Sequence, residues 1–69
     1  MKLAFQRSSG DEVEIANVKG KDEAMDQIKK FLDWHHYKSY YTRMWHDDEQ
    51  SCTWFDVGSH TEFFKLYDE

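Results

Sequence analysis

The residue types needed for hydrolytic chemistry lie close together near the end of the chain. Ser59, His60 and Glu62 supply the side chains of a hydrolase triad, and Cys52 with His60 would supply those of a thiol enzyme. Neighbours within one turn cannot reach the relay geometry of a triad by themselves, and a chain of 69 residues has little room for a closed pocket. More simply, Ser59 and Thr61 satisfy backbone groups of the turn, and His60 orients it by a hydrogen bond. We therefore predict that the protein is not an enzyme and has no catalytic residue.

The four histidines raise the question of a metal site. His35 and His36 are adjacent on a predicted helix and so point about 100 degrees apart, which makes them a poor pair of ligands. His46 and His60 each lie near acidic residues, but polar positions in turns and at sheet edges explain them more simply. No spacing typical of a Cys/His metal site occurs. We predict no metal and no cofactor.

The chain has more aromatic surface than one small core needs. Eight of its twelve aromatic residues lie between Tyr40 and Tyr67, a segment that also contains Arg43 and Lys65. Exposed aromatic area lowers solubility unless something covers it. The direction in which the surplus rings point is therefore the main indication of function. The strands on which these rings lie determine that direction.

The first element is a predicted β-hairpin. Leu3 and Phe5, and later Val13 and Ile15, alternate with polar residues on either side of the loop 8–10, which ends in a glycine. This spacing pairs Phe5 with Val13 and Leu3 with Ile15, so that all four side chains share one face.

A helix follows the hairpin. Asp22 is a suitable N-cap, Glu23 falls in the first turn, and the pattern predicts a helix from Asp22 to His36. The residues at helical spacing are Ala24, Met25, Ile28, Phe31, Leu32 and His35.

From Ser39 the pattern changes to a period of two. It predicts a strand from Ser39 to His46, a turn at 47–50 and a second strand ending at Val57. The expected pairs are Trp45 with Cys52, Arg43 with Trp54, and Tyr41 with Asp56; Tyr40, Thr42 and Met44 then share the core face with Thr53, Phe55 and Val57.

A last strand is expected from Glu62 to Tyr67, with Phe64 and Leu66 inward. The fold class is therefore α+β in the order ββαβββ, an antiparallel sheet of four to five strands with one helix packed on one face, in a single domain of residues 1–69. The sheet face away from the helix stays open, and we call its predicted residues the aromatic face: Tyr41, Arg43, Trp45, Trp54, Phe63, Lys65 and Tyr67.

Charge and composition narrow the partners. The net charge of −5 argues against nucleic acid, because the nine basic residues are not clustered in sequence. No apolar run approaches the length of a membrane helix, so no membrane association is expected. The single cysteine suits a reducing compartment, which favours a cytoplasmic protein.

Two strings, from Tyr37 to Arg43 and from Asp56 to Phe64, resemble small proteins encoded by phages and prophages of Gram-positive bacteria. The string Gly-Ser-His-Thr-Glu-Phe-Phe at 58–64 is the more specific of the two. The resemblance covers most of the chain and implies a bacterial cytoplasm and a phage context. That group has no settled activity, so the resemblance carries over no catalytic residue.

The leading hypothesis is a non-enzymatic accessory protein that binds a protein partner or itself, as a homodimer, through the aromatic face. Arg43, Trp45 and Trp54 are its expected anchors. One alternative is single-stranded nucleic-acid binding by the same face, with bases stacked on the rings. Another is an acidic mimic of nucleic acid that captures a basic host protein.

Overall fold

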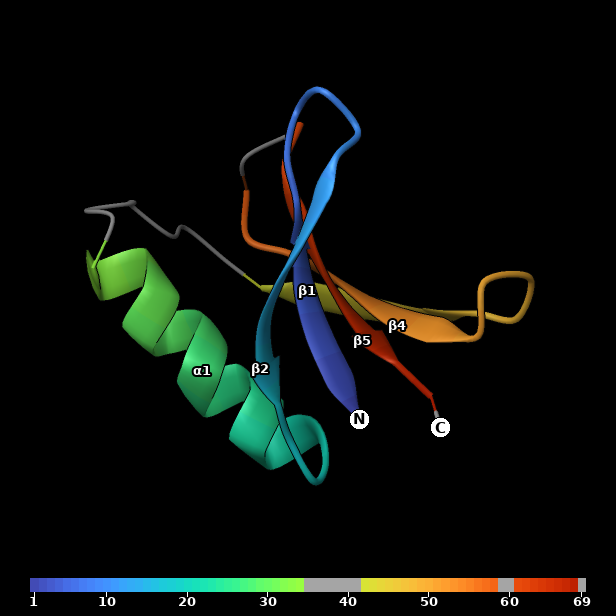
Figure 1. Cartoon of the computed structure of the whole chain (residues 1–69), viewed down its shortest axis with the longest axis horizontal. Coiled ribbons are helices and arrows are strands. Elements are labelled where there is room, and N and C mark those ends of the chain that lie inside the picture. The colour runs from blue at the N-terminus through green and yellow to red at the C-terminus, as the bar shows by residue number, and fades with distance from the viewer. Residues whose placement is uncertain (35–41, 59–60, 69) are drawn as a thin grey trace.

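The computed structural model describes residues 1–34, 42–58 and 61–68. They form one helix and five strands in the predicted order ββαβββ, so the α+β class is confirmed (Figure 1). The elements are β1 (Lys2–Gln6), β2 (Glu12–Asn17), α1 (Lys21–Trp34), β3 (Arg43–Asp47), β4 (Cys52–Asp56) and β5 (Phe63–Tyr67).

All five strands belong to one antiparallel sheet in the order β2-β1-β5-β4-β3. The last strand in the chain, β5, therefore lies in the middle, between the two hairpins. Phe64 and Leu66 on β5 are fully buried, as predicted, while β2 and β3 form the two edges.

The first hairpin closes as its loop sequence predicts. The Arg7 N–H donates to the Asp11 carbonyl at 2.8 Å, and Gly10 has a φ of 96°, which a glycine adopts at little cost. Phe5 lies opposite Val13, as expected. The pairing of Leu3 with Ile15 is wrong, because the register shifts between Leu3 and Ala4 and places Leu3 opposite Ala16. Strict alternation in the sequence does not reveal such a bulge.

Helix α1 begins one residue earlier than predicted. The Ala24 N–H donates to the Gly20 carbonyl at 3.0 Å, so Gly20 occupies the capping position, and Asp22 lies in the first turn instead. An aspartate there still interacts favourably with the helix dipole. His35 and His36, at the predicted end of the helix, lie outside the described residues.

Helix and sheet share one hydrophobic core. The Phe31 ring lies 4.7 Å from that of Phe5 and 5.3 Å from that of Phe64, measured between centroids. The buried members of this core are Leu3, Phe5, Val18, Ala24, Ile28, Leu32, Phe55, Val57, Phe64 and Leu66.

The second hairpin has a different register from the predicted one. Asp47 pairs with Cys52, Trp45 with Trp54, and Arg43 with Asp56, so the predicted partners of Arg43 and Trp45 are wrong by two residues. A shift of two leaves every side chain on its predicted face, because strands have a period of two. The start of the predicted strand, residues 39–41, lies outside the described part of the chain.

The loop explains the shift. Asp47 Oδ1 accepts hydrogen bonds from the Glu49 N–H at 3.0 Å and the Gln50 N–H at 3.2 Å, and Ser51 has a φ of 52°. The aspartate side chain thus organises the residues that follow it. The loop consists of residues 48–51, and the pairing starts at Asp47.

Met44 was expected in the core, together with Thr53 and Phe55. Those two are buried, but Met44 is 55% exposed. Met44 lies on β3, an edge strand of the sheet, and the hydrophobic core of the described residues includes no residue of β3. The core under α1 does not extend to this edge.

Candidate functional site

Three aromatic rings from three adjacent strands pack together on the aromatic face. The indoles of Trp45 and Trp54 are within 5° of parallel, with centroids 5.9 Å apart. Phe63 meets both edge-on, at 5.4 Å from Trp54 and 6.4 Å from Trp45. Both geometries are favourable for aromatic pairs. The ladder produces this cluster by placing Trp45 directly opposite Trp54.

The cluster points away from the core that contains α1. Trp54 stands between Thr53 and Phe55 on β4, and Phe55 belongs to the same buried core as Ile28. Successive side chains on a strand point to opposite faces, so Trp54 faces the other way. The aromatic residues therefore form a second, smaller cluster of their own.

Lys65 lies on this face but is 4% exposed, so it is not the open charge that the sequence pattern suggested. Its Nζ is 4.2 Å from the centroid of the Trp54 ring, a cation–π contact. The same Nζ donates to Gln50 Oε1 at 2.8 Å and to Glu12 Oε2 at 3.2 Å. The positive charge of Lys65 is therefore paired within the protein.

Tyr67 is tied to the same carboxylate. Its hydroxyl donates to Glu12 Oε1, and Lys2 Nζ lies 4.6 Å from the centroid of its ring. Burial, together with the neighbouring Glu12, raises the pKa of Tyr67. Burial also opposes the charged form of Glu12, but the hydrogen bonds from Tyr67 and Lys65 outweigh it and hold the pKa of Glu12 below its ordinary value.

Arg43 is the most accessible cation of the aromatic face. Its Nη2 donates to Asp56 Oδ2 at 2.8 Å, and 66% of its side chain remains exposed. Its guanidinium carbon lies 6.0 Å from the centroid of the Trp45 ring. Asp56 also accepts a hydrogen bond from the Gly58 N–H at 2.8 Å, which fixes the position of the carboxylate. A partner can therefore contact Arg43 without moving it far.

Trp54 is the half-buried centre of the cluster and Trp45 its accessible edge. Trp54 Nε1 donates to Asp47 Oδ2 at 3.2 Å, and this bond is the main cause that lowers the pKa of Asp47. Trp45 is 43% exposed. An approaching molecule would therefore meet the Trp45 indole first.

Sequence reasoning missed the groups that partner these cations. Glu12, Gln50 and Asp56 were absent from the predicted site, yet they bind Lys65 and Arg43. The signal for Asp56 was present: a four-residue loop after Asp47 places Arg43 opposite Asp56. Tyr41, the remaining predicted site residue, lies outside the described residues.

The described residues give little support to a catalytic site or a metal site. Ser59 and His60 lie outside them, and residues 1–34, 42–58 and 61–68 contain no group of three or more His, Cys, Asp or Glu side chains that could hold a metal ion. Cys52 is fully buried, and burial raises the pKa of its thiol, which disfavours a nucleophile. The only helix among these residues is too short to cross a membrane.

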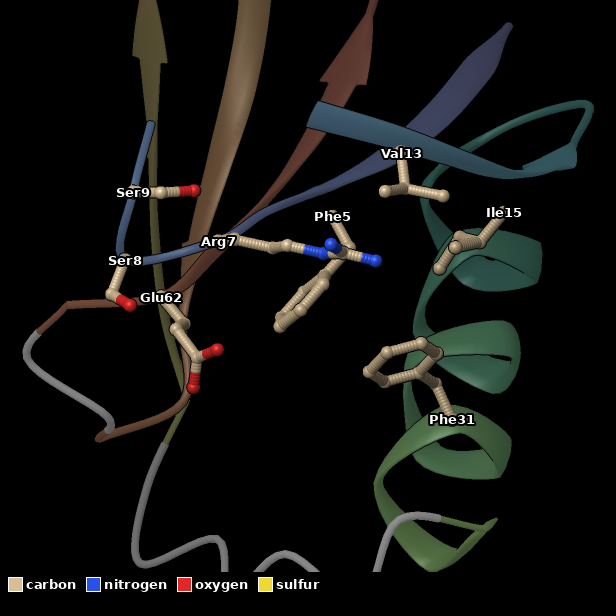
Figure 2. A pocket seen from close by; sticks show the side chains of 8 residues that line it. All are labelled: Phe5, Arg7, Ser8, Ser9, Val13, Ile15, Phe31 and Glu62. Atoms are coloured by element: carbon tan, nitrogen blue, oxygen red, sulfur yellow. The ribbon is translucent and has the colours of Figure 1, made fainter. Parts of the chain in front are cut away.

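A cavity of about 500 Å³ opens between the first hairpin and α1 (Figure 2). It lies on the α1 side of the sheet, away from the aromatic cluster. Figure 2 shows Arg7 and Glu62 beside an apolar set of side chains. The residues that line it are Phe5, Arg7, Ser8, Ser9, Val13, Ile15, Phe31 and Glu62.

Compared with known proteins, the chain matches no family model, no curated protein and no solved structure. What the aromatic face does is therefore inferred from its own geometry.

Proposed function

We propose that the protein is a non-enzymatic binding protein that holds a protein partner, or a second copy of itself, through the aromatic face. The observation that carries this proposal is the accessible indole of Trp45, stacked on Trp54 and flanked by the exposed side chain of Arg43. Tryptophan and arginine are enriched among residues that dominate interface energies. The indole buries a large area with few rotatable bonds, and the planar guanidinium offers five hydrogen-bond donors.

The cluster is also held in place before any partner arrives. Trp54 is fixed by its bond to Asp47 and by Lys65 against its ring, and Arg43 is fixed by Asp56. Rigid contact groups lose little conformational entropy on binding, so more of the contact energy appears as affinity. This arrangement supports a binding role better than a catalytic one.

Two observations weigh against nucleic acid as the partner. Lys65 already pairs with Glu12, and Arg43 with Asp56, so phosphates would have to compete with carboxylates. The net charge of −5 adds a general repulsion. The acidic mimic is weakened similarly, because Glu12, Asp56 and Asp68 each pair with a basic side chain of the protein. The resemblance of residues 58–64 to phage and prophage proteins supports an accessory role in a bacterial host.

The test is affinity capture from a bacterial lysate with quantitative mass spectrometry, comparing Trp45→Ala and Arg43→Ala with wild type. Trp34→Ala is the matched control, because Trp34 is also exposed but lies at the end of α1. We expect the first two variants to lose specific partners or self-association at least tenfold, and the control to keep them. Equal behaviour of all three variants would refute the proposal. Strong binding of labelled single-stranded DNA or RNA at low salt would favour nucleic acid instead.

A further inference from the structure

The two edges of the sheet differ in how they are protected against pairing with another strand. Edge β2 has Glu12 and Glu14 and a bulge opposite β1, which are features that discourage pairing between copies. Edge β3 has neither lysine nor proline, and it pairs with β4 in an unbroken register over all its residues. Among the described residues, no strand pairs with its outer side.

Strand β3 also exposes apolar side chains on both faces. Met44 and Trp45 are two of the four large hydrophobic residues that are exposed in the described part of the chain. An exposed, regular and partly apolar edge strand is the feature that most readily adds a further strand. Edge β3 is therefore suited to an interface.

The sequence of β3 is complementary to itself. When two copies run antiparallel about Trp45, Arg43 of each copy lies opposite Asp47 of the other, and Met44 lies opposite His46. Arg43, Trp45 and Asp47 lie on one face, because they alternate along the strand. The pairing about Trp45 thus brings two opposite charges together on each side of the axis and a pair of indoles at its centre.

We propose that two copies of this chain associate through β3, forming one continuous antiparallel sheet with Trp45 on the twofold axis. This inference rests on the proposed function and identifies the partner as a second copy of the chain, bound along the edge strand β3. The dimer stacks four indoles in a row, Trp54 and Trp45 of one copy followed by Trp45 and Trp54 of the other. The isologous arrangement closes on itself and leaves the β2 edges outside.

The contacts within each copy are compatible with the dimer. Arg43 has five donor hydrogens and an exposed side chain, so it keeps Asp56 while it reaches Asp47 of the other copy. Asp47 Oδ2 accepts one hydrogen bond, from Trp54 Nε1, and an oxygen of a carboxylate has two lone pairs. Neither the bond from Arg43 to Asp56 nor the bond from Trp54 to Asp47 has to break.

Sedimentation equilibrium from low to several hundred micromolar protein tests the pairing. Arg43→Asp places two aspartates opposite each other, and Asp47→Lys does the same with two basic residues. We expect each variant alone to associate at least about tenfold more weakly than wild type. An equimolar mixture of the two restores both opposite-charge pairs, so we expect it to form a heterodimer.

Thermal melting of each variant shows whether it folds, and Arg43→Asp leaves the loop bonds of Asp47 intact. Amide hydrogen exchange locates the contact: we expect the amides of β3 that point away from β4 to exchange more slowly as wild-type concentration rises. A monomeric wild type would overturn the inference, as would association by Arg43→Asp as strong as that of wild type, or a dimer whose β3 amides gain no protection. A monomer that still captures a partner in a Trp45-dependent way would leave the proposed function standing.

Discussion

Trp45 and Trp54 face each other across the β3–β4 ladder with their indoles nearly parallel, yet the two have different roles. Trp54 contacts Trp45, Phe63 and Lys65 and donates to Asp47, so it holds the cluster together. Trp45 lies on the edge strand and contributes mainly surface. Trp54 thus stabilises the cluster, while Trp45 provides the surface for the proposed binding.

This division predicts unequal losses of stability for two alanine variants. Trp54→Ala should lower the free energy of unfolding by about 2 kcal/mol, since it leaves a gap and uncovers Lys65. Trp45→Ala should cost less than about 1 kcal/mol, since much of its ring is already in water. Urea unfolding of both variants measures the difference. A larger loss for Trp45→Ala would contradict the assigned roles.

Removing Glu12 should destabilise the protein more than removing the charge of its partner Lys65. Glu12→Ala leaves the buried ammonium of Lys65 with Gln50 as its one remaining hydrogen-bond partner among the described residues. We therefore expect a loss of about 1–2 kcal/mol, moderated because Glu12 is partly exposed. Lys65→Met removes the charge and keeps a long apolar side chain against Trp54, and it should cost less. A double-mutant cycle read by urea unfolding tests this order, and a more severe effect of Lys65→Met would reverse it.

His46 should make stability depend on pH. Its ring bonds Asp68 at 2.8 Å and Asp48 at 2.9 Å, and the bond to Asp68 is the main cause that raises its pKa above 6.5 in the folded state. The protonated ring is therefore favoured by folding. Its contribution is fully present below the unfolded pKa and disappears as pH rises through the higher, folded pKa.

We expect the melting temperature of wild type to fall as pH rises above about 6.5. His46→Gln and Asp68→Asn should both flatten this dependence. Melting curves across this range check the sign, and an unchanged slope in both variants would show that another group causes it.

Cys52 should be protected from thiol reagents by the fold. It is fully buried, and burial raises its pKa, so both access and thiolate content are low. We expect an aromatic disulfide reagent to label the native protein far more slowly than the urea-unfolded protein. Rapid labelling of the native protein would mean that β4 and β5 separate often.

The sequence predicted best what depends on local pattern. The period of two around Lys65 identified Phe64 and Leu66 as the buried face of β5, and the spacing of Ala24, Ile28 and Leu32 identified the buried side of α1. These patterns depend on nearby residues only. They survived even where the strand register was wrong.

The predictions that failed depend on the geometry of a single turn or bulge, or on partners that are distant in the sequence. The bulge between Leu3 and Ala4 and the bonds from Asp47 to its loop each shift a register, and alternation alone does not show either one. The burial of Lys65 requires Glu12, which is far from it in the chain. A charged residue in an outward position therefore looked open although its partners enclose it.

The central position of β5 affects how the chain folds during its synthesis on the ribosome. Without β5 the two hairpins share no strand contact, because β1 and β4 meet only through it. Lys2 therefore cannot pair with Tyr67, its neighbour in the ladder, until the chain up to Tyr67 has emerged from the exit tunnel. Contacts so distant in sequence slow the closure of a fold. A nascent chain that stops short of Phe63 would present two hairpins with no strand pairing between them to the quality-control machinery.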